Sequence, residues 1–207
     1  MFRSVRLRKT FNQNKIEKGG RREVLNKVEA ASRVLVVSHC LLNKSTRWWC
    51  EGKPIERNMG LATKLIEFAS NHSIGLIQLP CPEFTFCGNP RPPRTKDEYE
   101  ALNGFIEHCK KLAKLSVEQI ESLVSMSQKP RIEILAVVGV KRSPSCAVNS
   151  APKKVNADKY IEEEEGVFLG LLRREMQKRG LNTSFIEFDF DEPEKIEEEI
   201  AEILGEE

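Results

Sequence analysis

Three short apolar segments, each followed by a cysteine, decide the fold of this chain. They read Val-Leu-Val-Val-Ser-His-Cys at residues 34–40, Ile-Gly-Leu-Ile-Gln-Leu-Pro-Cys at 74–81, and Ile-Leu-Ala-Val-Val-Gly-Val at 134–140, which Cys146 follows after a short loop. Runs of consecutive apolar residues are typical of strands that are buried on both faces of a sheet. In open α/β sheets, ligands bind beyond the carboxyl ends of the strands. We therefore expect Cys40, Cys81 and Cys146 to meet at one edge of a sheet.

The order of the remaining segments predicts the fold class. We expect strands at 34–38, 74–79, 132–140 and 184–188, with helical patterns between them. This alternation predicts an α/β fold, a Rossmann-like doubly wound parallel sheet of about four to five strands with flanking helices.

The helices are predicted from apolar residues at helical spacing. One helix should carry Met59, Leu61, Leu65, Ile66 and Phe68. A helical pattern over 95–128 should break near Leu115, because Ser116 and Gln119 resemble a capping box. The Gly- and Pro-rich loop before it should be irregular. A third helix should begin near Asp158 or Tyr160, with Glu162 to Glu165 in its first turns, and end at Gly180. The last should carry Ile196, Ile200 and Leu204.

Length and charge predict one domain with a basic extension. The chain has 207 residues and a formal net charge of +2, but its first thirty or so residues are strongly basic. We divide it into a partly disordered or helical extension, 1–32, with a short helix from about Arg21 to Ser32, and a single α/β domain, 33–207. A basic arm of this kind can bind RNA. It also resembles an organelle transit peptide, but it lacks the apolar core of a secretory signal.

The compartment follows from the same features. No stretch approaches the roughly 18 to 20 apolar residues of a membrane helix, which predicts no membrane contact. We expect a reducing cytoplasm, where cysteines are more often ligands, nucleophiles or core residues than disulfides.

The cysteine spacing favours an iron–sulfur cluster over zinc. Structural zinc sites use four ligands in short paired spacings, and the chain has no Cys-x-x-Cys or His-x-x-x-His pair. Clusters accept scattered cysteines that the fold brings together. A cluster held by three thiolates leaves one iron open as a Lewis acid for a substrate sulfur. Cys50 and Cys87 are candidate substitute ligands, and the trio can also be three core-adjacent cysteines placed there by chance.

Several motifs together resemble one known family. They are Ser-His-Cys-Leu-Leu-Asn at 38–43, Pro-Cys-Pro-Glu at 80–83, Gly-Asn-Pro-Arg-Pro-Pro-Arg at 88–94 and Arg-Ser-Pro-Ser-Cys at 142–146. In this order they are similar to the thiouracil desulfidase (TudS-like) family, formerly a domain of unknown function, and closest to a TudS-related desulfidase branch. The resemblance runs from about residue 34 to 188.

The resemblance implies a cofactor and roles for individual residues. It implies a 4Fe-4S cluster on Cys40, Cys81 and Cys146, whose unligated iron takes the sulfur of a thiolated base while water replaces it at carbon. It also implies that Glu83 acts as acid and base and that Ser143 lies close to the substrate. Two departures, Asn43 and Ala147 where the family often has glycine, and the unusual loop 44–57, put the substrate's identity in doubt.

Chemistry agrees with these roles but leaves alternatives open. Glu83 stands two residues after a proposed ligand, where a carboxylate can activate water, an effect worth roughly 10²–10⁴-fold. It can instead cap a helix or pair with Arg91 or Arg94. Ser143 and Ser145 can donate hydrogen bonds to substrate or cluster, or form an ordinary Ser-Pro turn.

Four further side chains are weaker candidates for substrate contact. They are His39, which can equally be a hydrogen-bonded core residue; Asn43; Ser145; and Arg91, which with Arg94 would make the rim electropositive. Trp48 and Trp49 can form an aromatic wall for a flat heterocycle or cover the sheet edge.

We conclude from the sequence that the chain is a desulfidase acting on a small thiolated molecule, a thiouracil-like heterocycle or thioamide. The main alternative is a non-enzymatic cluster or metal protein, a sensor or scaffold. A third hypothesis has the basic arm bind RNA and present thiolated tRNA. The sequence leaves the oligomeric state of the protein open.

Overall fold

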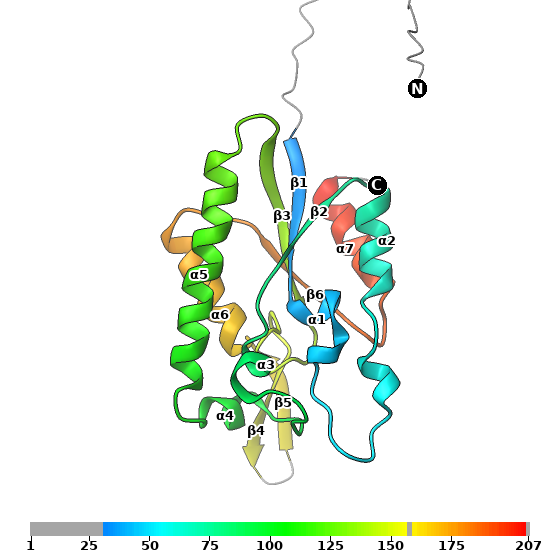
Figure 1. Ribbon diagram of the computed structural model, residues 1–207, viewed down its shortest axis with the longest axis vertical. Coiled ribbons are helices and arrows are strands. Elements are labelled where there is room, and N and C mark those ends of the chain that lie inside the picture. Colours follow the sequence, from blue (N-terminus) through cyan, green and yellow to red (C-terminus); the bar gives the residue numbers. More distant parts are fainter. Residues whose placement is uncertain (1–30, 157–158, 206–207) are drawn as a thin grey trace, which may run out of the picture.

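A four-stranded parallel sheet lies at the centre of the computed structural model, which describes residues 31–156 and 159–205 (Figure 1). Its strand order is β2-β1-β3-β6, with β1 at Ala31–Val37, β2 at Gly75–Gln78, β3 at Arg131–Val140 and β6 at Ser184–Phe188. All three pairings are parallel. The predicted doubly wound α/β fold is confirmed.

Two helical layers enclose this sheet (Figure 1). Helices α2 (Thr63–Asn71) and α7 (Lys195–Leu204) pack together over one face, and α5 (Phe105–Met126) and α6 (Val167–Lys178) pack over the other. Alternate residues of β1 serve the two layers: Leu35 and Val37 belong to the core under α2 and α7, while Val36 belongs to the core under α5 and α6. Burial on both sides explains the unbroken apolar runs.

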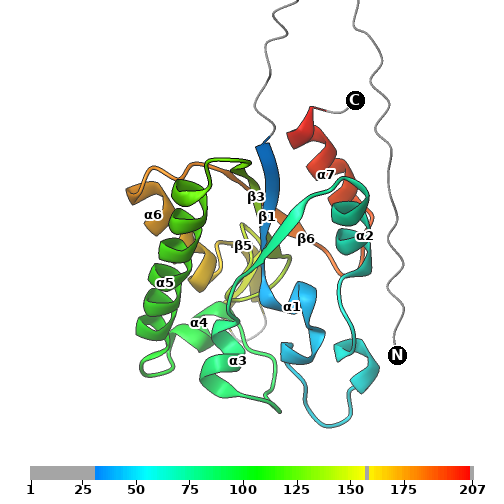
Figure 2. The ribbon, with the colours of Figure 1, turned by 45° about the horizontal axis from the view of Figure 1, so that its top comes forward.

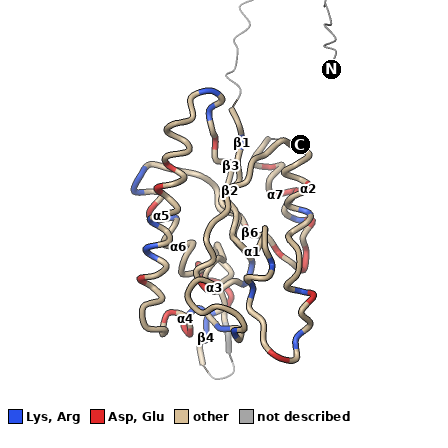
Figure 3. Tube along the Cα trace, in the orientation of Figure 1, with Lys and Arg blue, Asp and Glu red and all other residues tan. Residues whose placement is uncertain are grey.

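Charged residues are distributed as expected for a sheet that is covered on both faces. Figure 3 shows Lys, Arg, Asp and Glu mainly on the outer helices and the loops. The buried part of β1, Val34–Val37, and the second half of β3 carry no charge. Among the described helices, none is long and apolar enough to cross a membrane.

The first strand begins earlier than predicted. Ala31 and Ser32 already belong to β1 and pair with β3, so the predicted helix from Arg21 cannot extend to Ser32. The rest of the predicted basic extension lies outside the described residues.

The first predicted helix is shorter than expected. Met59 and Leu61 precede α2 and are exposed, because Gly60 adopts a positive φ of 75° that interrupts the helical backbone. Only the later members of the predicted stripe, such as Leu65 and Phe68, pack into the core.

The predicted break near Leu115 is wrong. Helix α5 runs without interruption through Ser116, whose side chain is buried inside it. The chain instead breaks at 101–104, between α4 (Lys96–Glu100) and α5. The capping box is formed by Thr95 and Glu98 at the start of α4.

The helix predicted from Asp158 or Tyr160 begins only at Val167. An antiparallel hairpin precedes it, with β4 at Ala151–Asn156 and β5 at Lys159–Glu164, so Glu162 to Glu164 lie in a strand. Tertiary pairs hold this polar hairpin against α4: Lys96 binds Glu164, and the backbone N–H of Lys154 donates to Asp97. These contacts override a local sequence that favours a helix.

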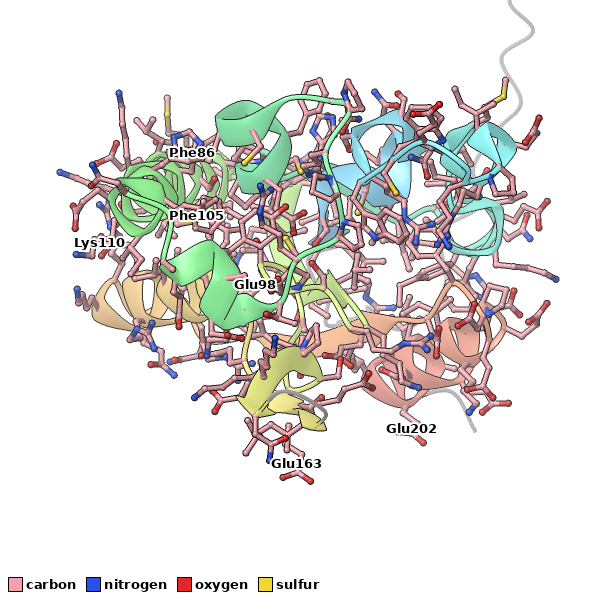
Figure 4. The ribbon with its side chains drawn as sticks, turned by 90° about the horizontal axis from the view of Figure 1, so that it is seen from below. Phe86, Glu98, Phe105, Lys110, Glu163 and Glu202 are labelled. Carbon is pink, nitrogen blue, oxygen red and sulfur yellow. The ribbon has the colours of Figure 1, made fainter. Side chains whose placement is uncertain are left out.

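Most of the connecting elements gather at the carboxyl ends of the central strands (Figure 2). They are α1 (His39–Leu42), two short 3₁₀ turns, η1 (Lys44–Thr46) and η2 (Ile55–Asn58), and α3 (Pro82–Cys87). Helix α3 lies in a stretch whose structure the sequence did not predict. It is fixed to α5 by Phe86, which packs edge-on against Phe105 with ring centroids 5.3 Å apart (Figure 4).

Candidate functional site

The three predicted ligand cysteines follow three neighbouring strands. Cys81 comes after β2, Cys40 after the central strand β1, and Cys146 after β3, and the strand order β2-β1-β3 sets the same order for the cysteines. Successive strands are added on opposite sides of β1, with β2 on one side and β3 on the other, and α/β sheets open a crevice for ligands at such a switch point. The topology therefore brings the three thiols to one place.

A single cavity of about 90 Å³ occupies this crevice. Its lining includes the sulfur-bearing residues Cys40, Cys81 and Cys146 together with Glu83 and Ser143. These are all five residues that the sequence places in the cofactor site and the catalytic apparatus. The remaining lining is Thr46, Arg47, Trp48, Arg91, Val140, Lys141, Arg142 and Pro144.

The loop that carries Cys146 is held from two sides. The Cys146 carbonyl accepts from the N–H of Val140, and a side chain on Gly139 would place its Cβ only 2.4 Å from that carbonyl oxygen. The Ser145 carbonyl accepts two free N–H groups in the first turn of α6, those of Phe168 and Leu169. The glycine and the helix end together fix where the thiol lies.

On the far side of the same loop, Glu187 of β6 binds the backbone. Its Oε1 accepts from the N–H groups of Val148 and Asn149, at 2.6 and 2.9 Å, and from the Ser150 hydroxyl. A carboxylate that accepts several such bonds stabilises a loop strongly.

The three thiols are free and influence one another. Burial, and then the charge of Cys81, raises the pKa of Cys40 to about 12. Burial, and then the charge of Glu83, raises the pKa of Cys81 to about 11, although its Sγ accepts the N–H of Phe84 at 3.4 Å. Burial, followed by the charges of the other two thiols, raises the pKa of Cys146 well above its ordinary value. Without a positive ligand, these thiols are protonated at neutral pH.

The spacing of the candidate ligands bears on the kind of metal group that they can hold. Thiolates bound to one ion at about 2.3 Å lie within about 4.6 Å of each other. Among the described residues, no three His, Cys, Asp or Glu side chains are grouped closely enough to hold a single ion. Ligands of a multi-iron cluster bind different metal atoms and stand further apart, which suits three thiols around a shared cavity.

Glu83 belongs to a buried network with Arg91 and Tyr99. Its Oε2 accepts from Arg91 Nη2 and from the Tyr99 hydroxyl, both at 3.1 Å. Burial, and then the charge of Glu83, raises the pKa of Tyr99, so its hydroxyl stays a donor. Of the two partners that the sequence offered Glu83, Arg91 is the observed one; Arg94 lies over the Tyr99 ring instead.

Arg91 also ties together segments that are distant in sequence. Its guanidinium donates to the Thr46 carbonyl at 2.8 Å, to Asn89 Oδ1 at 2.7 Å and to the Gly88 carbonyl at 3.3 Å. Only 3% of Arg91 is exposed, so its charge depends on these oxygens and on Glu83.

The serines near Cys146 have different surroundings. Ser143 Oγ accepts the N–H of Cys146 at 3.0 Å, which leaves its own proton available. Ser145 is fully buried and does not line the cavity. Ser38, which the sequence did not single out, lies close enough to the Cys146 thiol to lower its pKa, although no hydrogen bond of normal geometry forms.

Several other predicted residues lie away from the cavity. His39 begins α1 and lines a separate surface pocket with Gln78 and Pro80. Asn43 caps η1, where its Oδ1 accepts the N–H of Ser45 at 3.2 Å. Of the two tryptophans, only Trp48 lines the cavity.

The substitute ligands are also outside the cavity lining. Cys50 and Cys87 are both partly buried, and neither lines it.

Sequence reasoning did not single out Arg47, Lys141 or Tyr99. Arg47 and Lys141 line the cavity, and Tyr99 reaches it only through Glu83. A partial signal existed, because Arg47 and Lys141 stand just after η1 and β3, close to the proposed ligands. The role of Tyr99 depends on a contact across 16 residues, which no local pattern indicates.

Comparisons with known proteins place most of the chain in one family. Residues 32–185, which include all three cysteines, Glu83 and Ser143, match the family described as "Putative 2-thiouracil desulfurase". A stretch of 116 residues, 56% of this chain and 68% of its relative, is 28% identical to the uncharacterized protein MJ0003 of Methanocaldococcus jannaschii. A solved structure of the 4Fe-4S-dependent thiouracil desulfidase TudS is 19% identical, with a TM-score of 0.49 over 85% of this chain and 99% of that one.

Proposed function

Because the chain belongs to the 2-thiouracil desulfurase family, we propose that it hydrolyses the carbon–sulfur bond of a thiouracil-like heterocycle. Water forms a new carbon–oxygen bond, the carbon–sulfur bond breaks, and both protons of the water leave with sulfur as hydrogen sulfide. The reaction needs no oxidant or reductant. The observation that carries the proposal is the cavity that is lined by Glu83, Ser143 and the cysteines that follow three neighbouring strands.

Within this proposal, Cys40, Cys81 and Cys146 hold a 4Fe-4S cluster. The fit rests on the donor set, because three cysteines with free thiols line one cavity and thiolates are the usual ligands of such clusters. When bound, the cluster supplies a Lewis-acidic iron that attracts the substrate sulfur. Burial, followed by neighbouring negative charges, raises the pKa values of the three thiols, so they would release protons when they bind a positive group.

Glu83 is the proposed acid and base. Arg91 and Tyr99 both donate to its Oε2, and no residue of the described chain donates to its Oε1. Oε1 is therefore free to accept a proton from water, while the two donors hold the carboxylate in place. The ion pair with Arg91 is in this view part of the catalytic apparatus rather than an alternative to it.

Ser143 is the proposed substrate contact. Its oxygen is already engaged by the N–H of Cys146, so its hydroxyl proton can be donated to a ring nitrogen or oxygen of the substrate. The same bond couples the orientation of this hydroxyl to the position of Cys146.

Iron content after anaerobic reconstitution tests the ligand assignment. Cys40→Ser, Cys81→Ser and Cys146→Ser should each lose most of the iron and the visible absorption of the cluster. Cys50→Ser and Cys87→Ser are matched controls outside the cavity lining and should retain both. Retention of iron by all three ligand variants would overturn the assignment.

Sulfide release from 2-thiouracil tests the reaction. Glu83→Gln should keep its iron and lose roughly 10²–10⁴-fold in kcat, the range for general acid and base catalysis. Full activity in this variant would exclude Glu83 as acid and base. A loaded protein that releases no sulfide from any thiolated heterocycle would contradict the enzyme and favour a sensor or scaffold.

A further inference from the structure

Ser38 occupies a helix-capping position without forming the capping bond. It is the N-cap residue of α1, where a serine hydroxyl usually accepts an N–H group of the first turn. Here the side chain accepts no such bond, and its hydroxyl has no other partner among residues 31–156 and 159–205. Only 1% of Ser38 is exposed, so bulk water cannot replace the missing partner. A buried hydroxyl in this state costs free energy, and most buried polar groups are paired.

The backbone of Ser38 is fixed at a junction of three elements. Ser38 directly follows Val37, which is in register with Val138 of β3. Its N–H donates to the Val138 carbonyl at 3.0 Å, and its own carbonyl accepts the N–H of Leu41 in α1 at 3.0 Å. The position of the hydroxyl is therefore set by β1, β3 and α1 together.

The loop after β3 returns Cys146 to the same junction. The Cys146 carbonyl accepts the N–H of Val140 at 2.8 Å, and it lies 2.4 Å from the place that a Cβ on Gly139 would take. Val138, which binds Ser38, stands two residues before Val140 on the same strand. Burial and the charges of the other thiols raise the pKa of Cys146, whereas the neighbouring Ser38 hydroxyl lowers it.

Ser38 approaches Cys146 from outside the cavity. Cys146 belongs to the cavity lining and Ser38 does not. A group that binds Cys146 within the cavity would therefore leave the Ser38 hydroxyl in its place beside the sulfur.

The chemistry of sulfur explains how this hydroxyl can gain a partner. The sulfur of a neutral thiol is a weak acceptor. A thiolate carries negative charge, and hydrogen bonds to ionised acceptors are shorter and about twice as strong as those between neutral groups. A metal-bound Cys146 thiolate would thus give the Ser38 hydroxyl the acceptor that the neutral thiol does not.

We propose that the Ser38 hydroxyl donates a hydrogen bond to the sulfur of Cys146 when that thiolate holds the cluster. This inference rests on the proposed function and concerns a ligand of the cluster rather than the substrate. The bond draws negative charge from the sulfur, and hydrogen bonds to the sulfurs are among the features that set the reduction potential of a cluster. Ser38 is therefore a positioning residue that acts through Cys146.

The reduction potential of the anaerobically reconstituted protein tests this bond. In Ser38→Ala, the potential should be more negative than in the wild type, because the bond stabilises the more negative, reduced cluster. A tenfold difference in that stabilisation corresponds to about 59 mV for one electron. A chelator should also remove iron about 10-fold faster, since a hydrogen bond to a charged group is lost. Ser38→Thr keeps a hydroxyl and should lie closer to the wild type than Ser38→Ala. An unchanged potential in Ser38→Ala would overturn the inference.

Ser116→Ala is the matched control. Ser116 is also buried, with 6% exposed, but it lies inside α5 and does not line the cavity. Its replacement should change neither the potential nor the rate of iron loss. Equal shifts in Ser116→Ala and Ser38→Ala would overturn the inference, because the loss of any buried hydroxyl would then have the same effect.

Urea unfolding of the cluster-free protein separates this role from a purely structural one. Ser38→Ala should not lower the unfolding midpoint, because it removes an unpaired hydroxyl and no hydrogen bond of the fold. Loss of a capping serine has the opposite effect and lowers stability. A lower midpoint in Ser38→Ala would therefore assign the hydroxyl to the fold and overturn the inference.

Sulfide release from the same samples separates this inference from the proposed function. If the loaded wild type releases no sulfide but Ser38→Ala shifts the potential, the proposed reaction fails and the hydrogen bond stands. If the wild type is active and Ser38→Ala leaves the potential unchanged, this inference alone fails.

Discussion

Replacing Arg91 with methionine should destabilise the fold more than any single surface charge change. The substitution removes the partner of a buried carboxylate and leaves Glu83 Oε2 with Tyr99 alone. It also leaves the Thr46 carbonyl without its donor. Removing one member of a buried ion pair costs about 3–5 kcal/mol, because the other charge stays buried without compensation. That is a large part of the roughly 5–15 kcal/mol that stabilises a typical domain.

The size of the effect should depend on the charge of Glu83. In a Glu83→Gln background, no buried carboxylate is left behind, and Tyr99 can still donate to the amide oxygen. The loss of unfolding free energy in the double variant should therefore be smaller than the sum of the two single losses. The difference should be at least about 2 kcal/mol, which is within the range seen for contacting residues. The stability of Arg91→Lys should lie between those of the wild type and Arg91→Met, because an ammonium keeps the charge but cannot reproduce the fork that reaches both Glu83 and Thr46.

Urea unfolding of the cluster-free protein at neutral pH measures these free energies, provided the m-values agree between variants. Lys110→Met is a control, since Lys110 forms an exposed ion pair with Glu107 and should cost less than about 1 kcal/mol. Single losses that add to within about 0.5 kcal/mol would refute the argument. In that case Glu83 would not depend on Arg91, and the ordered carboxylate of the proposed reaction would lose its basis.

Gly139→Ala should cost about 1–3 kcal/mol by overpacking and should lower the iron content, because its Cβ would meet the Cys146 carbonyl. Gly170→Ala is the control, since its Cβ meets only a flexible glutamate; equal iron loss in both would contradict this reasoning. Asp189 should stabilise the fold in a pH-dependent way. Burial alone would raise its pKa, but the N–H of Asp191 and the Lys141 ammonium lower it below the ordinary value. The stabilisation relative to Asp189→Asn should therefore be complete above about pH 5 and shrink as the pH falls below about 4; a pH-independent difference in unfolding free energy would contradict it.

The elements that the sequence predicts well are those whose burial is nearly complete. Strand β6 was predicted with the observed bounds, and the other central strands with small differences at their ends, because residues covered on both faces must be apolar throughout. Helix α7 was predicted from three core contacts at helical spacing, of which Ile196 and Ile200 are fully buried. In these segments the exclusion of water is enough to determine the pattern of apolar residues.

The errors fall where distant contacts decide the structure. The Lys- and Glu-rich hairpin of β4 and β5 has no apolar alternation, and it is held against α4 by the Lys96–Glu164 ion pair and by the Lys154 N–H, which donates to Asp97. The false capping box at Ser116 arose because a buried serine inside a long helix looks, in sequence, like a cap. Only the packing of α5 distinguishes the two.

The same distinction applies to the site and explains why its ligands were easier to predict than its electrostatics. A residue at the end of a buried strand is placed by the sheet, so the topology alone carries Cys40, Cys81 and Cys146 to one edge. The charges that surround them are placed by loops that cross the sheet edge, as when Arg91 reaches the Thr46 carbonyl 45 residues away. Strand ends therefore determine which groups meet, and loop contacts determine their charge state. Substrate preference should follow the second set, because the charged side chains that line the cavity, among them Arg47 and Arg91, are carried by loops.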